Sequence, residues 1–189
     1  MSNTSATFDY VIIGGGTAGC LLANRLSAEP RNRVLLLEAG KADRYPWIHI
    51  PVGYLYCIGN PRTDWLYHTE PDAGLNNRVQ RYPRGKVLGG CSSINGMIYM
   101  RGQARDYDGW AKTTGEDSWA WQNALADFKA HESHYRLDQG ADPKTGNNSR
   151  FSDMHGSGGE WRVEKQRLRW DVLDSFADAA EQAGIEKIE

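Results

Sequence analysis

Two short apolar runs flank a helical pattern at the start of the chain. Residues 8–13 (FDYVII) end in three glycines, which predicts a buried strand. Residues 17–28 place apolar side chains on one face of a predicted helix, and a second apolar run at 34–37 ends in Glu38. Strand, helix and strand at this spacing predict a βαβ unit with two parallel strands.

The pattern becomes irregular after this unit. Residues 40–84 lose regular periodicity and contain recurrent prolines with aromatic residues between them, which predicts an extended loop with short helical turns. A loop of that length inside a domain is usually functional. Residues 85–102 are rich in glycine and contain a short apolar stretch at 94–100.

The last part of the chain contains two further helical patterns. A helix is predicted over 118–133, with Ser118 as a candidate N-cap. Residues 138–159 are mostly turn formers and predict a surface loop, and 161–163 predict a short strand. Apolar positions between Val172 and Ala183 define a final amphipathic helix that Gly184 closes.

The turn between the first strand and the first helix reads GGGTAG, which matches G-x-G-x-x-G. Gly14 permits the tight turn, Gly16 allows a pyrophosphate to approach the backbone, and Gly19 lets the helix pack closely on the sheet. Glu38 stands 19 residues after Gly19 (38 − 19), where an acid hydrogen-bonds the adenosine ribose. The residues predicted to contact the ADP half of the dinucleotide are Gly14, Gly16, Thr17, Ala18, Gly19, Glu38 and Ala39. The pattern fits FAD and NAD equally.

A second motif decides between these cofactors. Residues 83–110 (PRGKVLGGCSSINGMIYMRGQARDYDGW) resemble the first signature of the glucose–methanol–choline (GMC) flavoprotein oxidoreductases, with Cys91 where the pattern usually has Gly, Ser or Thr. Residues 63–76 resemble the segment that precedes this signature in choline and aliphatic alcohol dehydrogenases. The resemblance implies FAD, with flavin contacts at Val87, Asn95, Gly96, Met97 and Ile98. Gly90, together with Gly89, is expected to let the chain pass the pyrophosphate.

The same resemblance implies how the flavin is held. Some members of the family bind it covalently through a histidine in this signature, and the matching position is Ile94, which cannot form that bond. Non-covalent FAD is therefore expected. Of the apolar residues here, Ile94 and Met100 are equally explained as core.

The resemblance also implies an activity and a domain organisation. Family members oxidise an alcohol by hydride transfer to the flavin, so we expect a primary alcohol to become an aldehyde, with oxygen, a quinone or a dye-like acceptor taking the electrons. The fold class is α/β, a Rossmann-type FAD-binding unit with a long lid loop. We expect residues 1–155 to belong to the FAD-binding domain and 156–189 to begin a substrate domain. The catalytic histidine is expected beyond residue 189, which makes the chain a fragment of a longer enzyme.

Two alternative functions stay open at this point. One is an NAD-dependent Rossmann oxidoreductase, which would leave residues 85–102 unexplained. The other is a truncated remnant that binds FAD without catalysis.

Composition and charge limit the other kinds of protein that this chain could be. A net charge of -2 gives no indication of nucleic-acid binding, and no apolar stretch approaches the roughly 20 residues of a membrane span. With three cysteines and no apparent leader, we expect a cytoplasmic protein, at most peripheral to the inner membrane. His131 and His134 lack an evident third ligand, so no metal site is predicted.

Overall fold

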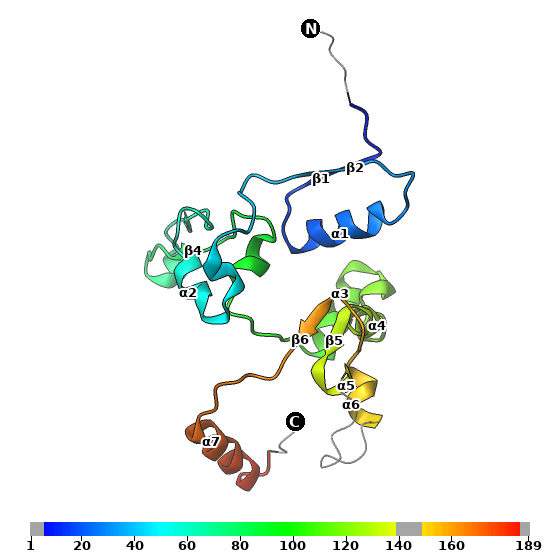
Figure 1. Ribbon diagram of the computed structural model, residues 1–189. Helices are drawn as coiled ribbons and strands as arrows, with labels where there is room; N and C mark the ends of the chain where they lie inside the picture. The colour runs from blue at the N-terminus through cyan, green and yellow to red at the C-terminus, as the bar shows by residue number, and fades with distance from the viewer. Residues whose placement is uncertain (1–5, 139–148, 186–189) are drawn as a thin grey trace. The chain divides into compact units, whose positions relative to one another are not determined.

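The computed structural model describes residues 6–138 and 149–185, which belong to two compact units, Met1–Ile98 and Tyr99–Glu189 (Figure 1). Two small sheets lie in the first unit and one lies in the second. The expected α/β class is confirmed.

The βαβ unit opens the first unit with the predicted order of elements, but its first strand is not buried as predicted, since Tyr10, Val11 and Ile13 are 43%, 54% and 87% exposed. Its elements are β1 (Tyr10–Ile13), α1 (Thr17–Ser27) and β2 (Val34–Leu37). The strands pair in parallel from Tyr10 opposite Val34 to Ile13 opposite Leu37. Helix α1 packs against both strands (Figure 1), and Gly19 is its buried residue.

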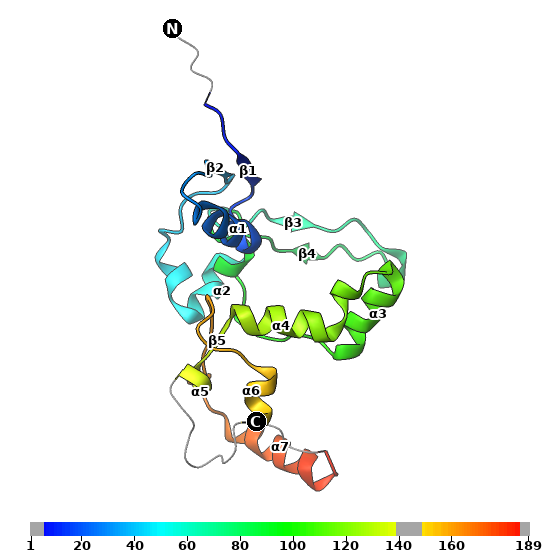
Figure 2. The same cartoon turned by 90° about the vertical axis from the view of Figure 1, so that its right-hand side faces the viewer.

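The predicted loop over 40–84 contains more regular structure than expected. Besides short helical turns, it holds an antiparallel pair of strands, which the sequence analysis missed (Figure 2). The elements of this region are η1 (Pro46–His49), η2 (Pro51–Gly53), α2 (Tyr54–Cys57), β3 (Tyr67–His68), η3 (Ala73–Leu75), β4 (Arg81–Tyr82) and, after it, η4 (Gly90–Ser93). Each strand is only two residues long, which is too short to give an alternating pattern.

The core of the first unit joins this loop to the glycine-rich segment. Cys57, Val87 and Ile94 are buried together. Beside them the Asp64 carboxylate is 3% exposed and accepts the backbone N–H groups of Gly59, Leu66 and Arg84 at 2.7, 3.0 and 3.1 Å. Burial by itself would raise the pKa of Asp64, but these donors outweigh it and lower that pKa. Asp64 therefore holds an irregular segment that few apolar contacts stabilise.

The second unit is mainly helical. Its elements are α3 (Ala104–Thr114), η5 (Asp117–Trp119), α4 (Trp121–His131), β5 (Glu132–His134), α5 (Tyr135–Asp138), α6 (Ser149–Met154), β6 (Trp161–Val163) and α7 (Asp171–Gln182). Strand β6 and helix α7 lie where they were predicted. Helix α3 was missed, although Gln103 and Asp106 form a capping box at its start and Gly115 ends it at φ 74°.

The predicted helix over 118–133 is correct in its centre and wrong at both ends. Ser118 is not its N-cap, because α4 begins at Trp121, whose N–H donates to the Asp108 carboxylate of α3 at 3.0 Å. The last predicted residues instead form β5, which pairs in parallel with β6. The predicted loop over 138–159 is wrong where α6 forms, and residues 139–148 lie outside the described part.

The predicted domain boundary after residue 155 stays a prediction. Strand β6 lies beyond that boundary and pairs with β5 within the second unit. Among the described helices, none combines the length and apolar character that a membrane crossing requires.

Candidate cofactor site

The end of β1 turns sharply into α1 at the glycine fingerprint. Gly14 has φ 97°, a left-handed conformation that favours glycine, and its N–H donates to the carbonyl of Leu37 at 2.7 Å. The chain therefore leaves the sheet directly at the N-terminus of α1. This places Thr17 and Ala18, both exposed, at the first turn of the helix.

The N-terminus of α1 is suited to an anion. No side chain caps it and its first turn contains no acid. The N–H of Cys20 bonds back to the Gly16 carbonyl at 2.9 Å, so the amides that precede Cys20 are those that a helix leaves without an intrahelical acceptor. Together with the positive end of the helix dipole, such amides attract phosphate oxygens.

The three glycines of the fingerprint are required for different reasons. Gly14 is needed for its positive φ. A Cβ on Gly19 would lie 1.9 Å from the Gly14 carbonyl oxygen, so close packing excludes any side chain there. Gly16 has an ordinary φ of -78°, and the nearest atom to its added Cβ would be Gly90 Cα at 4.0 Å. Neither conformation nor packing of the chain requires glycine at 16, which is the expected result if the space belongs to a ligand.

The second motif lies directly against the first. The N–H of Gly89 donates to the carbonyl of Gly15 at 2.6 Å, and Gly16 and Gly89 form a β-bridge. Gly90 has φ 56°, and a Cβ there would lie 2.8 Å from Gly16 Cα. The fingerprint and the signature, far apart in the sequence, therefore form one glycine-lined cradle, defined here as Gly14–Gly16, the first turn of α1 and Gly89–Gly90.

Glu38 lies beside this cradle. Its two carboxylate oxygens accept the N–H groups of Gly15 and Gly40, each at 2.7 Å. The carboxylate therefore braces the turn, a role that the sequence analysis did not anticipate. Each oxygen has a second lone pair that can accept a ribose hydroxyl, so the ribose contact stays a proposal. Ala39 follows it and is exposed.

The predicted flavin-side residues divide into two groups. Val87 is 1% exposed and packs in the core of the first unit, so its side chain is occupied in holding the signature loop. Asn95, Gly96, Met97 and Ile98 are exposed, and Ile98 reaches 83%. The Asn95 side-chain oxygen accepts the Met97 N–H at 2.8 Å, which supports Met97 at φ 60°. This exposed stretch is available for a flat ring.

The two residues that were also explained as core behave differently. Ile94 is 3% exposed and belongs to the core, whereas Met100 is 82% exposed. The core explanation is therefore confirmed for Ile94 and wrong for Met100.

A polar cluster in the second unit resembles a metal site. Ligand atoms of Glu132, His134 and His155 all lie within 4.8 Å of one another, and His155 supplies a partner that the sequence spacing did not reveal. The Glu132 carboxylate is already bound by the Arg101 guanidinium, by the Gly156 N–H at 2.7 Å and by His155 Nδ1 at 3.0 Å. A metal ion would lie beside the Arg101 charge. We therefore interpret this cluster as a buried ion-pair network.

This network predicts an acid-sensitive second unit. Burial lowers the pKa of His134, and the His155 charge lowers it further. The unfolded chain then binds a proton that the folded chain excludes, so stability is expected to fall as the pH drops below about 6.5. Urea unfolding of the chain at pH 5.5 and 7.5 would measure this, and His134→Gln should reduce the difference. An equal difference in that variant would contradict the assignment.

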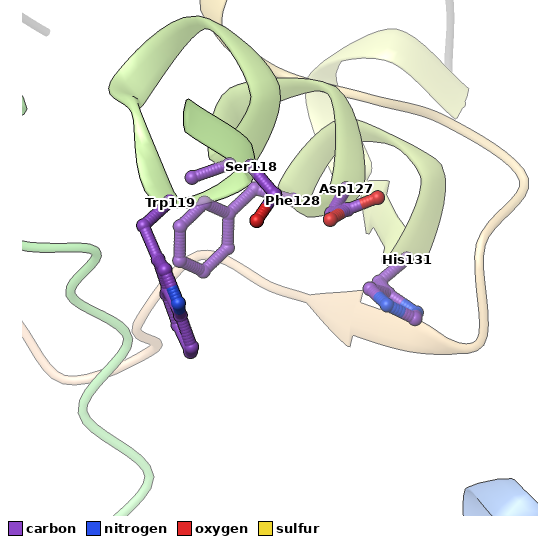
Figure 3. Close-up of a pocket in the computed structure, with 6 residues that line it drawn as sticks. Ser118, Trp119, Asp127, Phe128 and His131 are labelled. Atoms are coloured by element: carbon purple, nitrogen blue, oxygen red, sulfur yellow. The ribbon is translucent and has the colours of Figure 1, made fainter. Parts of the chain in front are cut away.

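A cavity of about 400 Å³ lies in the second unit, between η5 and α4. Figure 3 shows Trp119 and Phe128 on one side and Asp127 and His131 on the other. The side chains of His131 and Glu160 approach to 3.9 Å. None of the predicted cofactor contacts lines this cavity.

The βαβ unit and its glycine cradle have the architecture of a Rossmann-type fold. The sequence model of the family described as GMC oxidoreductase matches residues 8–188. The chain belongs to the GMC oxidoreductase family.

Curated relatives agree with this assignment. The chain is 42% identical to an alcohol dehydrogenase [acceptor] of Pseudomonas putida over 94% of this chain and 30% of that protein. It is 40% identical to an oxygen-dependent choline dehydrogenase of Staphylococcus aureus over 99% of this chain and 31% of that protein. The chain thus spans about 30% of the length of these relatives.

Solved structures show the same architecture. The pyridoxine 4-oxidase from Mesorbium loti superimposes with a TM-score of 0.74 at 36% identity, over 94% of this chain and 32% of that one. A variant of the formate oxidase of Aspergillus oryzae RIB40, made to study FAD modification, gives a TM-score of 0.78 at 26% identity. The match covers 97% of this chain and 31% of that one.

Proposed function

We propose that this chain is the FAD-binding front part of an oxidoreductase that converts a primary alcohol to an aldehyde. Family membership supports the class, and the names of the relatives, alcohol dehydrogenase and choline dehydrogenase, support an alcohol substrate. The proposal covers the whole enzyme, of which this chain is the part described.

The observation that carries the proposal is that a Cβ added to Gly16 would lie no closer than 4.0 Å to any protein atom beyond its neighbours. A glycine that neither backbone conformation nor packing requires lies between an uncapped helix N-terminus and the Gly89–Gly90 turn. A pyrophosphate seated there would accept amide hydrogens of the first turn of α1. The signature loop against this space favours FAD over NAD, because that loop leads into the exposed stretch Asn95–Ile98.

We assign the residues of the chain as follows. Gly16, Thr17 and Ala18 would hold the pyrophosphate through backbone N–H groups, and Glu38 would accept a ribose hydroxyl. Residues 95–98 would lie beside the ring, where backbone N–H groups can bond its polar edge. The bound flavin supplies the hydride-accepting N5 atom. By family resemblance, the base that takes the hydroxyl proton lies beyond residue 189.

Cofactor identity can be tested directly on the chain. Titration with FAD should give a bound visible spectrum and quench tryptophan fluorescence, whereas NAD at equal concentration should do neither. Binding of NAD in preference to FAD would contradict the proposal. Alcohol oxidation is tested in a polypeptide of the relatives' length that begins with this chain: anaerobic addition of a primary alcohol should bleach the flavin.

The mode of attachment is a separate prediction. Ile94 offers no nucleophilic atom and lies in the core, so FAD is expected to be non-covalent. Acid precipitation of the FAD-loaded protein should leave the yellow colour in the supernatant. Colour that stays with the precipitated protein would contradict it.

A further inference from the structure

A second cavity in the first unit has no place in the proposed function. It measures about 300 Å³, at the lower end of the usual range for small-molecule sites. Its lining residues are Lys41, Ala42, Arg44, Tyr45, Arg62, Thr63 and Val87.

The charge of this cavity is entirely positive. Lys41, Arg44 and Arg62 line it, and no acid does. Within residues 6–138 and 149–185, none of these three cations forms an ion pair with a carboxylate. All three are exposed residues on the border of one hollow, so their positive charges favour an anion that enters it.

The two nearby acids are engaged elsewhere. The Asp43 carboxylate lies 3.8 Å from His49 Nε2. Asp64, next to the lining residue Thr63, is 3% exposed and accepts backbone N–H groups. Neither acid lines the cavity.

One of the cations is held in place before any ligand binds. The Arg62 guanidinium lies over the Tyr45 ring, 4.6 Å from its centroid, and the Tyr45 hydroxyl is 3.4 Å from the Asn60 side-chain nitrogen. A stacked guanidinium loses little freedom when it forms hydrogen bonds, and its planar fork matches two oxygens of a phosphate.

We propose that this basic cavity binds a small phosphate-bearing anion. Arginine favours phosphate over a halide because it pairs with two oxygens at once. No residue of the cradle lines the cavity. The carbonyl of Lys41, a lining residue, accepts the Leu88 N–H at 2.9 Å. Val87, a predicted flavin contact, lines the cavity with a side chain that is 1% exposed and belongs to the core. The site is therefore distinct from the pyrophosphate position at α1.

The test is a titration of the chain with inorganic phosphate at low ionic strength, in which calorimetry measures the binding. Arg62→Gln should weaken binding about tenfold, the loss of one charge-assisted contact. Arg62→Lys keeps the charge and should weaken it less. Arg31→Gln removes the same charge at an exposed site that pairs with Glu29, and it should leave binding unchanged. Circular dichroism would show that each variant is folded.

Two results would overturn the inference. One is equal phosphate affinity in the wild-type chain and the Arg44→Gln/Arg62→Gln variant. The other is loss of phosphate binding when FAD saturates the protein, which would place the phosphate in the cradle. Phosphate binding that persists in the presence of FAD supports a separate site. The first phosphate titration needs no FAD. Its result would therefore be the same if the chain did not bind FAD as proposed.

Discussion

Replacing Gly16 with alanine is expected to weaken FAD binding about a hundredfold, roughly 2.7 kcal/mol, without unfolding the chain. The new Cβ would meet no protein atom closer than Gly90 Cα at 4.0 Å, so the fold accepts it. The same Cβ would fill the space through which a pyrophosphate reaches the amides of α1. Each charge-assisted hydrogen bond that is lost there is worth about 1.5–3 kcal/mol.

The matched control for this variant is Gly109→Ala in α3. An added Cβ at Gly109 also meets nothing within 4 Å, but it lies in the second unit. Fluorescence titration with FAD should separate the two variants, and thermal unfolding should show both to be folded. An unchanged FAD affinity in Gly16→Ala would remove the basis for the cradle.

Replacing Glu132 with alanine is expected to destabilise the second unit by about 3–5 kcal/mol. The Glu132 side chain is fully buried, and Arg101, its partner, is 9% exposed. Removal of the carboxylate leaves that guanidinium buried without a counter-charge, and it also frees the Gly156 N–H. Urea unfolding followed by tryptophan fluorescence would measure the loss.

An exposed pair provides the comparison for this prediction. Glu164 pairs with Arg162, and both side chains are at least half exposed. Glu164→Ala should therefore cost less than about 1 kcal/mol. A similar loss of stability in the two variants would show that the buried ion-pair network does not stabilise the second unit more than an exposed ion pair does.

The sequence predicted those elements whose pattern is set by local packing. The βαβ unit follows from two apolar runs and one helical face, and β2 has the predicted bounds. Helix α3 was missed because its sequence is strongly polar, with Gly109 in its middle and Ala111 as its buried residue. Its capping box was present in the sequence and could have revealed it.

The parts of the site that depend on distant contacts could not be predicted in this way. Spacing located the fingerprint, but the contact between Gly16 and Gly90 exists only once the loop between them has folded. The same holds for His155, which reaches Glu132 from beyond α6. The bracing role of Glu38 also depends on the geometry of the turn, since its carboxylate oxygens accept the N–H groups of Gly15 and Gly40.

The bond from the Gly89 amide to the Gly15 carbonyl makes the signature loop a reporter on the nucleotide turn. A ligand that rigidifies Gly14–Gly16 should slow hydrogen–deuterium exchange at Gly89 as well, because the Gly89 N–H donates to the Gly15 carbonyl. Protection should spread from one glycine pair to the other on loading and disappear from both together on stripping. Cofactor occupancy could thus be followed by mass spectrometry in a peptide remote in sequence from the fingerprint.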